Sequence, residues 1–156
     1  MSWEPELEEL RRREALARDP ASHPDRASRV ERQHAAGKLT VRERVERLLD
    51  PGTFHETGAL AGSASYEDGE LAGFTPANMV CGRGEIEGRA AVVQGDDFTV
   101  RGGAADAAIW QKMVYAERLA HDLRLPLVRL VDGTGGGGSV KSLEQMGYTY
   151  VPFIPG

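Results

Sequence analysis

The fold of this chain is decided by Leu127-Val128-Arg129-Leu130-Val131-Asp132 and by the glycine-rich run that follows, Gly133-Thr134-Gly135-Gly136-Gly137-Gly138-Ser139. An apolar run that ends in an acid and then in glycines is typical of a strand that leads into an open turn. Glycine lets the backbone N–H groups of such a turn approach a ligand oxygen closely and form a concave nest. We therefore predict that the turn binds an oxyanion or a phosphate.

The turn by itself leaves several interpretations open. Gly133-x-Gly135-x-x-Gly138 has the spacing of a dinucleotide-binding turn, but no acid follows at the usual distance of about 20 residues. A phosphate loop fits less well, because Lys141 comes three residues after the last glycine of the turn instead of directly after it. The remaining interpretations are an oxyanion hole and a flexible glycine linker.

The residues before this strand predict how the turn is placed. Two strands, 78–86 and 89–94, flank a two-residue connection of the kind found in hairpins. A second glycine turn follows at 95–103, and apolar spacings of three and four then predict a helix from Ala104 that stops before Pro126. Strand, helix and strand form a βαβ unit, in which both glycine turns lie at the carboxyl ends of neighbouring strands. The predicted fold class is therefore α/β.

The amino-terminal third predicts helices. A solvated helix spans Glu4–Arg18, and a second covers 29–36 after a polar linker at 21–29. A third begins at Thr40, where Thr40-Val41-Arg42-Glu43 forms a capping box. We expect the Gly-, Ser- and acid-rich segment 58–75 to be a mobile loop.

Composition narrows the function classes. The chain has 156 residues, a net charge of −5 and a pI near 5.4, so it has no basic footprint for nucleic acid. No apolar stretch has the length of a membrane span, and the amino terminus is acidic where a signal peptide is basic. We therefore expect a cytoplasmic protein. The single cysteine, Cys81, is expected to be a buried apolar residue. We expect no metal site, because the histidines lack metal-ligand spacing.

A series of motifs carries a resemblance that runs from about Arg29 to Gly138. Together they resemble the amino-terminal part of the carboxyltransferase (β) subunit of biotin-dependent acyl-CoA carboxylases, the propionyl-CoA and methylcrotonyl-CoA carboxylase group. The resemblance implies a crotonase-like fold of repeated ββα units, with a helical segment at 1–52 and a partial acyl-CoA carboxyltransferase domain at 53–156. The motifs are Arg32-Gln33-His34, residues 37–44, residues 48–54, Gly82-Arg83-Gly84, Asp97-Phe98-Thr99-Val100, Gly102-Gly103 and Gly135-Gly136.

The resemblance also implies a chemistry for the glycines. The backbone N–H groups of Gly135 and Gly136 would stabilise the enolate oxygen of an acyl-CoA thioester, while Phe98, Gly102 and Gly103 would lie along the acyl-CoA. The carboxyl group would come from carboxybiotin on a biotin carboxylase or biotin carrier subunit, and the full-length family forms homo-oligomers. A charge at position 101, where the family usually has Phe, would alter which acyl-CoA is accepted.

The apolar end of the sequence, 148–156, leads us to expect a truncated product that is inactive alone. Two other functions remain open. One is a dinucleotide-binding module that uses Gly133, Gly135 and Gly138. The other is a non-catalytic interaction fragment whose amino-terminal helices pair with a full-length subunit.

Overall fold

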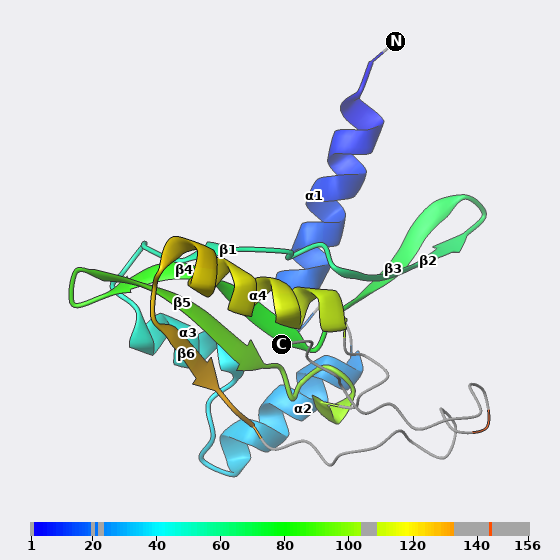
Figure 1. Ribbon diagram of the computed structural model, residues 1–156. Coiled ribbons are helices and arrows are strands. Elements are labelled where there is room, and N and C mark those ends of the chain that lie inside the picture. Colours follow the sequence, from blue (N-terminus) through cyan, green and yellow to red (C-terminus); the bar gives the residue numbers. More distant parts are fainter. Residues whose placement is uncertain (1, 20, 22–23, 104–108, 133–143, 145–156) are drawn as a thin grey trace.

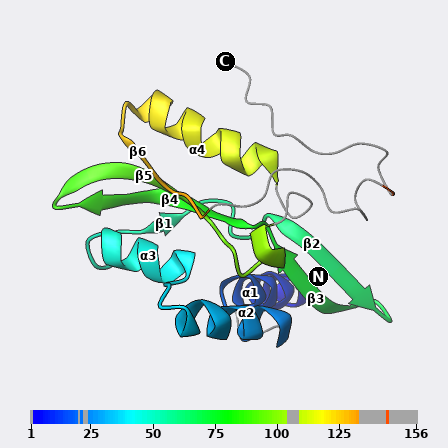
Figure 2. The ribbon, with the colours of Figure 1, turned by 90° about the horizontal axis from the view of Figure 1, so that it is seen from below.

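The computed structural model describes residues 2–19, 21, 24–103, 109–132 and 144 (Figure 1). A four-stranded sheet lies at the centre, with helix α4 on one face and helix α3 on the other (Figure 2). A two-stranded hairpin and the first helix extend away from this sheet (Figure 1). The glycine turn at 133–138 and the predicted helix start at Ala104 lie outside the described residues.

The four-stranded sheet has the order β1-β4-β5-β6. Strands β4 (Met79–Ile86) and β5 (Arg89–Asp96) form the predicted antiparallel hairpin, and the short β1 (His55–Glu56) pairs with the outer side of β4. Glu87 and Gly88 at the hairpin tip have φ values of 51° and 74°, the left-handed geometry that suits a tight two-residue turn. The strand pair is therefore confirmed.

The predicted βαβ unit is also confirmed. Helix α4 (Trp110–Leu123) leads from β5 to β6 (Leu127–Leu130), and β6 pairs with β5 in parallel. The helix ends at Arg124, which has a φ of 53° and whose N–H donates to the carbonyls of Ala120 and His121. The end of β6 therefore reaches the edge of the sheet at which β5 also ends.

Two small cores cover the faces of β5. Because neighbouring side chains of a strand point to opposite faces, Val92 packs towards α4 with Cys81 and Ala116, while Val93 packs towards α3. Val92 and Val93 are both 0% exposed, as expected for a strand covered on both sides. Cys81 has the buried apolar role that the sequence predicted.

Helix α3 (Val41–Leu48) begins at the predicted capping box. The N–H of Glu43 donates to the Thr40 hydroxyl at 3.3 Å, and the Glu43 carboxylate accepts from the Thr40 N–H at 2.7 Å. The apolar face of the helix packs directly on β5, where a Cβ on Gly95 would come within 2.4 Å of the Val41 side chain. Glycine at that position allows the close helix-to-strand contact.

The first helix, α1, spans Glu4–Arg18 as predicted, but the second differs from the prediction. Helix α2 spans Pro24–Ala35, so most of the segment at 21–29 is helical, and the predicted linker there is wrong. Proline is compatible with the first position of a helix, because the N–H that it lacks has no partner inside the helix. Pro24 therefore marks a helix start.

The predicted mobile loop at 58–75 is wrong as well. Strands β2 (Gly62–Glu67) and β3 (Glu70–Pro76) form an antiparallel hairpin there. Asp68 and Gly69 make its turn with φ values of 52° and 85°. Asp-Gly is a strong hairpin signal, and the buried Leu71 and Phe74 anchor one face of β3.

The described helices include none that is long and apolar enough to cross a membrane. The described residues also contain no group of three His, Cys, Asp or Glu side chains arranged to hold a metal ion.

Candidate functional site

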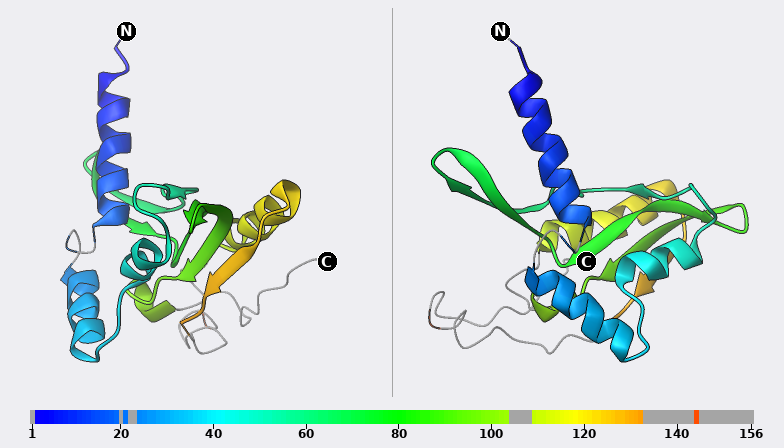
Figure 3. Two further views of the ribbon diagram at one scale, coloured as in Figure 1. Left: turned by 90° about the vertical axis from the view of Figure 1, so that its left-hand side faces the viewer. Right: turned by 180° about the vertical axis from the view of Figure 1, so that it is seen from behind.

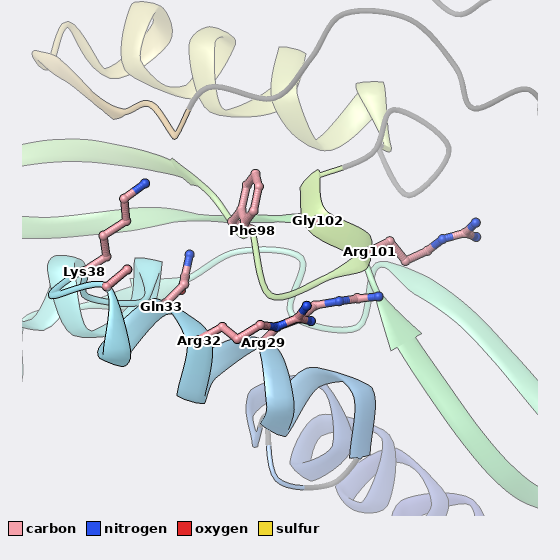
Figure 4. A pocket seen from close by; sticks show the side chains of 8 residues that line it. Arg29, Arg32, Gln33, Lys38, Phe98, Arg101 and Gly102 are labelled. Atoms are coloured by element: carbon pink, nitrogen blue, oxygen red, sulfur yellow. The ribbon is translucent and has the colours of Figure 1, made fainter.

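A cavity of about 490 Å³ opens between α2 and the turn that follows β5 (Figure 4). One wall is made by α2 and the residues just after it, and the other by the turn at 98–102. Figure 4 shows the side chains of both walls around this space. The lining residues are Arg29, Arg32, Gln33, Ala36, Lys38, Phe98, Arg101 and Gly102.

The α2 wall follows from helical periodicity. Arg29, Arg32, Gln33 and Ala36 are separated by three, one and three residues, so they share one face of the helix. The chain then turns at Gly37, which has a φ of 70°, and this turn brings Lys38 to the end of the same wall. The wall therefore places three cationic side chains along one side of the cavity.

The second wall is a left-handed turn. Arg101 and Gly102 have φ values of 50° and 64°, within a short 3₁₀ segment, Arg101–Gly103. Glycine adopts this conformation at no steric cost, whereas a residue with a Cβ, such as Arg101, is strained in it. Such strain persists only where surrounding structure holds it, and it clusters at ligand sites.

Asp97 fixes the start of this turn. Its carboxylate accepts hydrogen bonds from the backbone N–H and the hydroxyl of Thr99, and its own N–H donates to the carbonyl of Asn78 at 2.8 Å. Asp97 and Thr99 are 4% and 2% exposed. Because these hydrogen bonds and its burial hold the carboxylate in place, Asp97 shapes the turn.

Two arginines of α2 connect the walls. Arg29 Nη1 donates to the carbonyl of Thr99 at 3.2 Å, and Arg26 Nη2 lies 3.7 Å from Asp97 Oδ2, with both side chains almost fully buried. Arg26 Nη1 also donates to the Leu16 carbonyl at 3.0 Å, near the end of α1. Burial lowers the pKa of Arg26, and the Asp97 carboxylate opposes this shift. We call this group, Arg26, Arg29, Asp97 and Thr99, the α2 latch.

The charge of the cavity is one-sided. Among the described residues, its lining includes four cations, Arg29, Arg32, Lys38 and Arg101, and no carboxylate. The described lining also includes no histidine or cysteine, so these residues offer no side chain suited to general acid–base chemistry near neutral pH. The arrangement suits the binding of a molecule with several phosphate groups, because arginine and lysine donate charge-assisted hydrogen bonds to phosphate oxygens.

The structure places three of the five predicted site residues. Phe98 and Gly102 line the cavity, with Phe98 36% exposed. Gly103 is buried beside them, and its N–H donates to the carbonyl of Val100 at 2.9 Å. Gly135 and Gly136 lie outside the described residues, so their predicted role stays a prediction.

Sequence reasoning did not name the basic wall of the cavity as a site. The signal was present in the spacing of Arg29 and Arg32, which are three residues apart on a helix, followed by Lys38 just beyond its end. The predicted linker at 21–29 concealed this signal, because it made Arg29 a helix start instead of a mid-helix position.

The chain has clear relatives among known proteins. The carboxyl transferase domain family matches residues 32–151. The biotin-dependent acetyl-/propionyl-coenzyme A carboxylase beta5 subunit of Mycobacterium tuberculosis (strain CDC 1551 / Oshkosh) is 37% identical over 131 residues, which is 83% of this chain and 23% of that protein. The mitochondrial propionyl-CoA carboxylase beta chain of Homo sapiens is 37% identical over 121 residues, 76% of this chain and 22% of that protein.

Solved structures share the fold. A single-chain, multi-domain long-chain acyl-CoA carboxylase matches with a TM-score of 0.66 and 33% identity, over 86% of this chain and 14% of that one. Transcarboxylase 12S, a hexamer solved with hydrolysed methylmalonyl-coenzyme A bound, matches with a TM-score of 0.65 and 31% identity, over 94% of this chain and 28% of that one.

The comparisons confirm the predicted crotonase-like α/β fold, in part of its length. The chain spans about a quarter of the length of the curated relatives it matches. With a family match that covers most of its residues, the chain belongs to the carboxyl transferase domain family.

Proposed function

We propose that the chain is the acyl-CoA-binding part of a biotin-dependent acyl-CoA carboxylase carboxyltransferase subunit. The observation that carries the proposal is the cavity whose described lining has four cationic side chains and no acidic one. Coenzyme A carries a pyrophosphate and a 3′-phosphate, so it presents several negative charges close together. Arg29, Arg32, Lys38 and Arg101 supply matching positive charges, and Phe98 offers an aromatic face for the adenine ring.

The reaction needs a further set of donors. Removal of a proton from the α carbon of a thioester places negative charge on the thioester oxygen, and backbone N–H groups aimed at that oxygen stabilise it. We assign this role to Gly135 and Gly136, which come five and six residues after β6 in the sequence. Phe98, Gly102 and Gly103 lie along the acyl-CoA in this proposal, and carboxybiotin on a partner carrier supplies the carboxyl group when it is bound.

The relatives support the proposed partners. Their names describe biotin-dependent carboxylases, and the transcarboxylase 12S relative is described as a hexamer. We therefore propose a biotin carboxylase or biotin carrier subunit as a partner and a homo-oligomeric assembly. From the sequence, we also propose a cytoplasmic site of action. A dinucleotide-binding module is the second candidate function, because the basic cavity would also attract the pyrophosphate of NAD.

The test is calorimetric titration of the purified chain with propionyl-CoA and with NAD. Each charge-assisted hydrogen bond contributes about 1.5–3 kcal/mol, so Arg32→Glu should weaken binding of propionyl-CoA roughly 10- to 100-fold. The matched control is Arg47→Glu, which makes the same change on an exposed part of α3 away from the cavity. A Gly136→Pro variant, which lacks one N–H donor, tests the glycine turn.

The outcomes separate the candidates. Binding of propionyl-CoA that Arg32→Glu weakens and Arg47→Glu leaves unchanged supports the acyl-CoA site. Tight binding of NAD with none of propionyl-CoA would replace it by the dinucleotide module. A folded chain that binds neither ligand would leave the interaction fragment, and the proposal would fail.

A further inference from the structure

Helix α1 stands apart from the rest of the molecule. Figure 3 shows its amino-terminal turns extending away from both sheets, while its carboxyl-terminal end meets the body of the protein. One side of the helix faces the β2–β3 hairpin, where Glu9 and Arg13 contact the Tyr66 hydroxyl. The helix has 15 residues and is about 22 Å long. Most of its residues are exposed, so much of its surface is open to other molecules.

A second face of α1 carries an apolar stripe. Trp3, Leu7 and Leu10 are separated by four and three residues, the spacing of a helix-pairing seam. Their exposed fractions are 74%, 43% and 45%. At 100° per residue, this stripe lies about a third of a turn from Glu9 and Arg13, so the contact with the hairpin does not cover it.

The charges beside the stripe are arranged in opposite halves of the helix. Glu4 and Glu6 flank the stripe in the first half, whereas Arg11 and Arg13 flank it in the second half. Two copies of such a helix are complementary when they run in opposite directions, because each acidic half then meets a basic half. The antiparallel arrangement also places each helix dipole against its opposite.

We propose that α1 is a docking surface for a second copy of this chain, and that the two α1 helices pair antiparallel through the stripe of Trp3, Leu7 and Leu10. In the symmetric register, Leu7 packs on Leu10 of the second copy. Glu4 then lies beside Arg11 of the second copy. This interface lies away from the basic cavity and does not depend on the proposed acyl-CoA binding.

The antiparallel direction also suits the shape of the molecule. Because the amino-terminal end of α1 points away from the sheets, antiparallel pairing puts the two bodies at opposite ends of the helix pair (Figure 3). Parallel pairing would bring the acidic halves of both helices together. A seam of about two turns is smaller than a standard interface of roughly 1,600 Å², so we expect a dissociation constant on the order of micromolar.

The experiment is sedimentation velocity of the purified full chain over roughly 1–200 µM, a range chosen to span that affinity. The wild type should change from monomer to dimer across the range. Leu7→Glu should remain monomeric, because it places charge in the seam. Glu4→Arg and Arg11→Glu should each be monomeric alone, since each variant brings like charges together at these two positions in its own dimer.

Mixing the last two variants gives the sharpest result. In a mixed dimer, the arginine at position 4 of one chain meets the glutamate at position 11 of the other, so the 1:1 mixture should recover the dimer. The control is Glu8→Arg, which makes the same charge change as Glu4→Arg outside the seam and should dimerise like the wild type. Circular dichroism of each variant checks that α1 remains helical.

Three results would overturn the proposal. A wild-type chain that stays monomeric throughout the range has no such surface for itself. A dimer that survives Leu7→Glu uses another face. A 1:1 mixture of Glu4→Arg and Arg11→Glu that stays monomeric would exclude the antiparallel register.

Discussion

The strongest test of how the cavity is held together is to remove one charge from the α2 latch. In Asp97→Asn, the side chain keeps its size and one oxygen but loses the negative charge that faces Arg26. The guanidinium then stays buried, with the backbone carbonyls of Leu16 and Ala17 as its remaining hydrogen-bond acceptors in the described structure. An almost fully buried cation that loses its nearest carboxylate destabilises the folded state, although the more distant Asp19 still acts on Arg26.

The expected magnitude follows from the burial of the pair. The side chains of Arg26 and Asp97 are 6% and 5% exposed, so solvent screens their interaction little. Breaking a buried ion pair by removing one partner costs about 3–5 kcal/mol. The separation of 3.7 Å and the absence of a hydrogen bond between the two groups place this pair at the lower end, about 3 kcal/mol.

The assay is urea unfolding followed by circular dichroism, applied to Asp97→Asn, Arg26→Met and the double variant. With an m value of roughly 2 kcal/mol/M, a loss of about 3 kcal/mol lowers the midpoint by about 1.5 M. The double variant should be more stable than the sum of the single losses predicts, because no uncompensated buried charge remains. The control Asp68→Asn, in the exposed hairpin turn, should change the midpoint little.

Additive losses would refute this reasoning. If the double variant loses the sum of the two single losses within about 0.5 kcal/mol, the charges of Arg26 and Asp97 act independently. A midpoint for Asp97→Asn equal to that of the wild type would likewise show that the carboxylate charge contributes nothing to the fold.

Two further predictions concern the packing on either side of the sheet. Burial lowers the pKa of Lys112 below its ordinary value of 10.5, and its Nζ donates to the carbonyl of Met79. Between the folded and unfolded pKa values of Lys112, the unfolded chain binds more protons, so the free energy of unfolding should rise with pH in that window. Urea unfolding at several pH values should show less of this rise in Lys112→Met than in the wild type. Gly95→Ala should lower the free energy of unfolding by about 1–3 kcal/mol, because its Cβ would overlap the Val41 side chain at 2.4 Å, and an unchanged urea midpoint would contradict the close helix-to-strand contact.

Much of the local structure was predictable because its causes are local. The capping box at Thr40 fixed the start of α3, and the two-residue connection between 78–86 and 89–94 predicted the hairpin of β4 and β5. The two wrong predictions, a linker at 21–29 and a mobile loop at 58–75, were based on the polar composition of these segments. Each segment also contained a local signal for the structure that it forms. Pro24 lay within the predicted polar linker at 21–29 although it starts a helix, and Asp68-Gly69 was not used as a hairpin turn within the predicted loop at 58–75.

The candidate site was predictable only in part. The turn with Phe98 and Gly102 was identified through its resemblance to a family, but the cationic wall across from it was not. That wall depends on contacts such as the one between Arg29 and Thr99, which are 70 residues apart. The periodicity of a helix predicts which of its residues share a face, but it does not predict which other segment of the chain packs against that face.

The sequence by itself determined α1, the start of α3, the β4–β5 hairpin, the βαβ unit and the family, because capping, turn residues, apolar spacing and motifs act over short stretches of chain. Only the tertiary structure decided which charges are buried and what they face. Arg26 and Arg29 have the same local setting on α2, yet Arg26 is enclosed beside Asp97 while Arg29 lines a cavity. The pKa, the stability and the binding role of such a side chain depend on its solvation and its neighbours, and these are set when distant segments pack together.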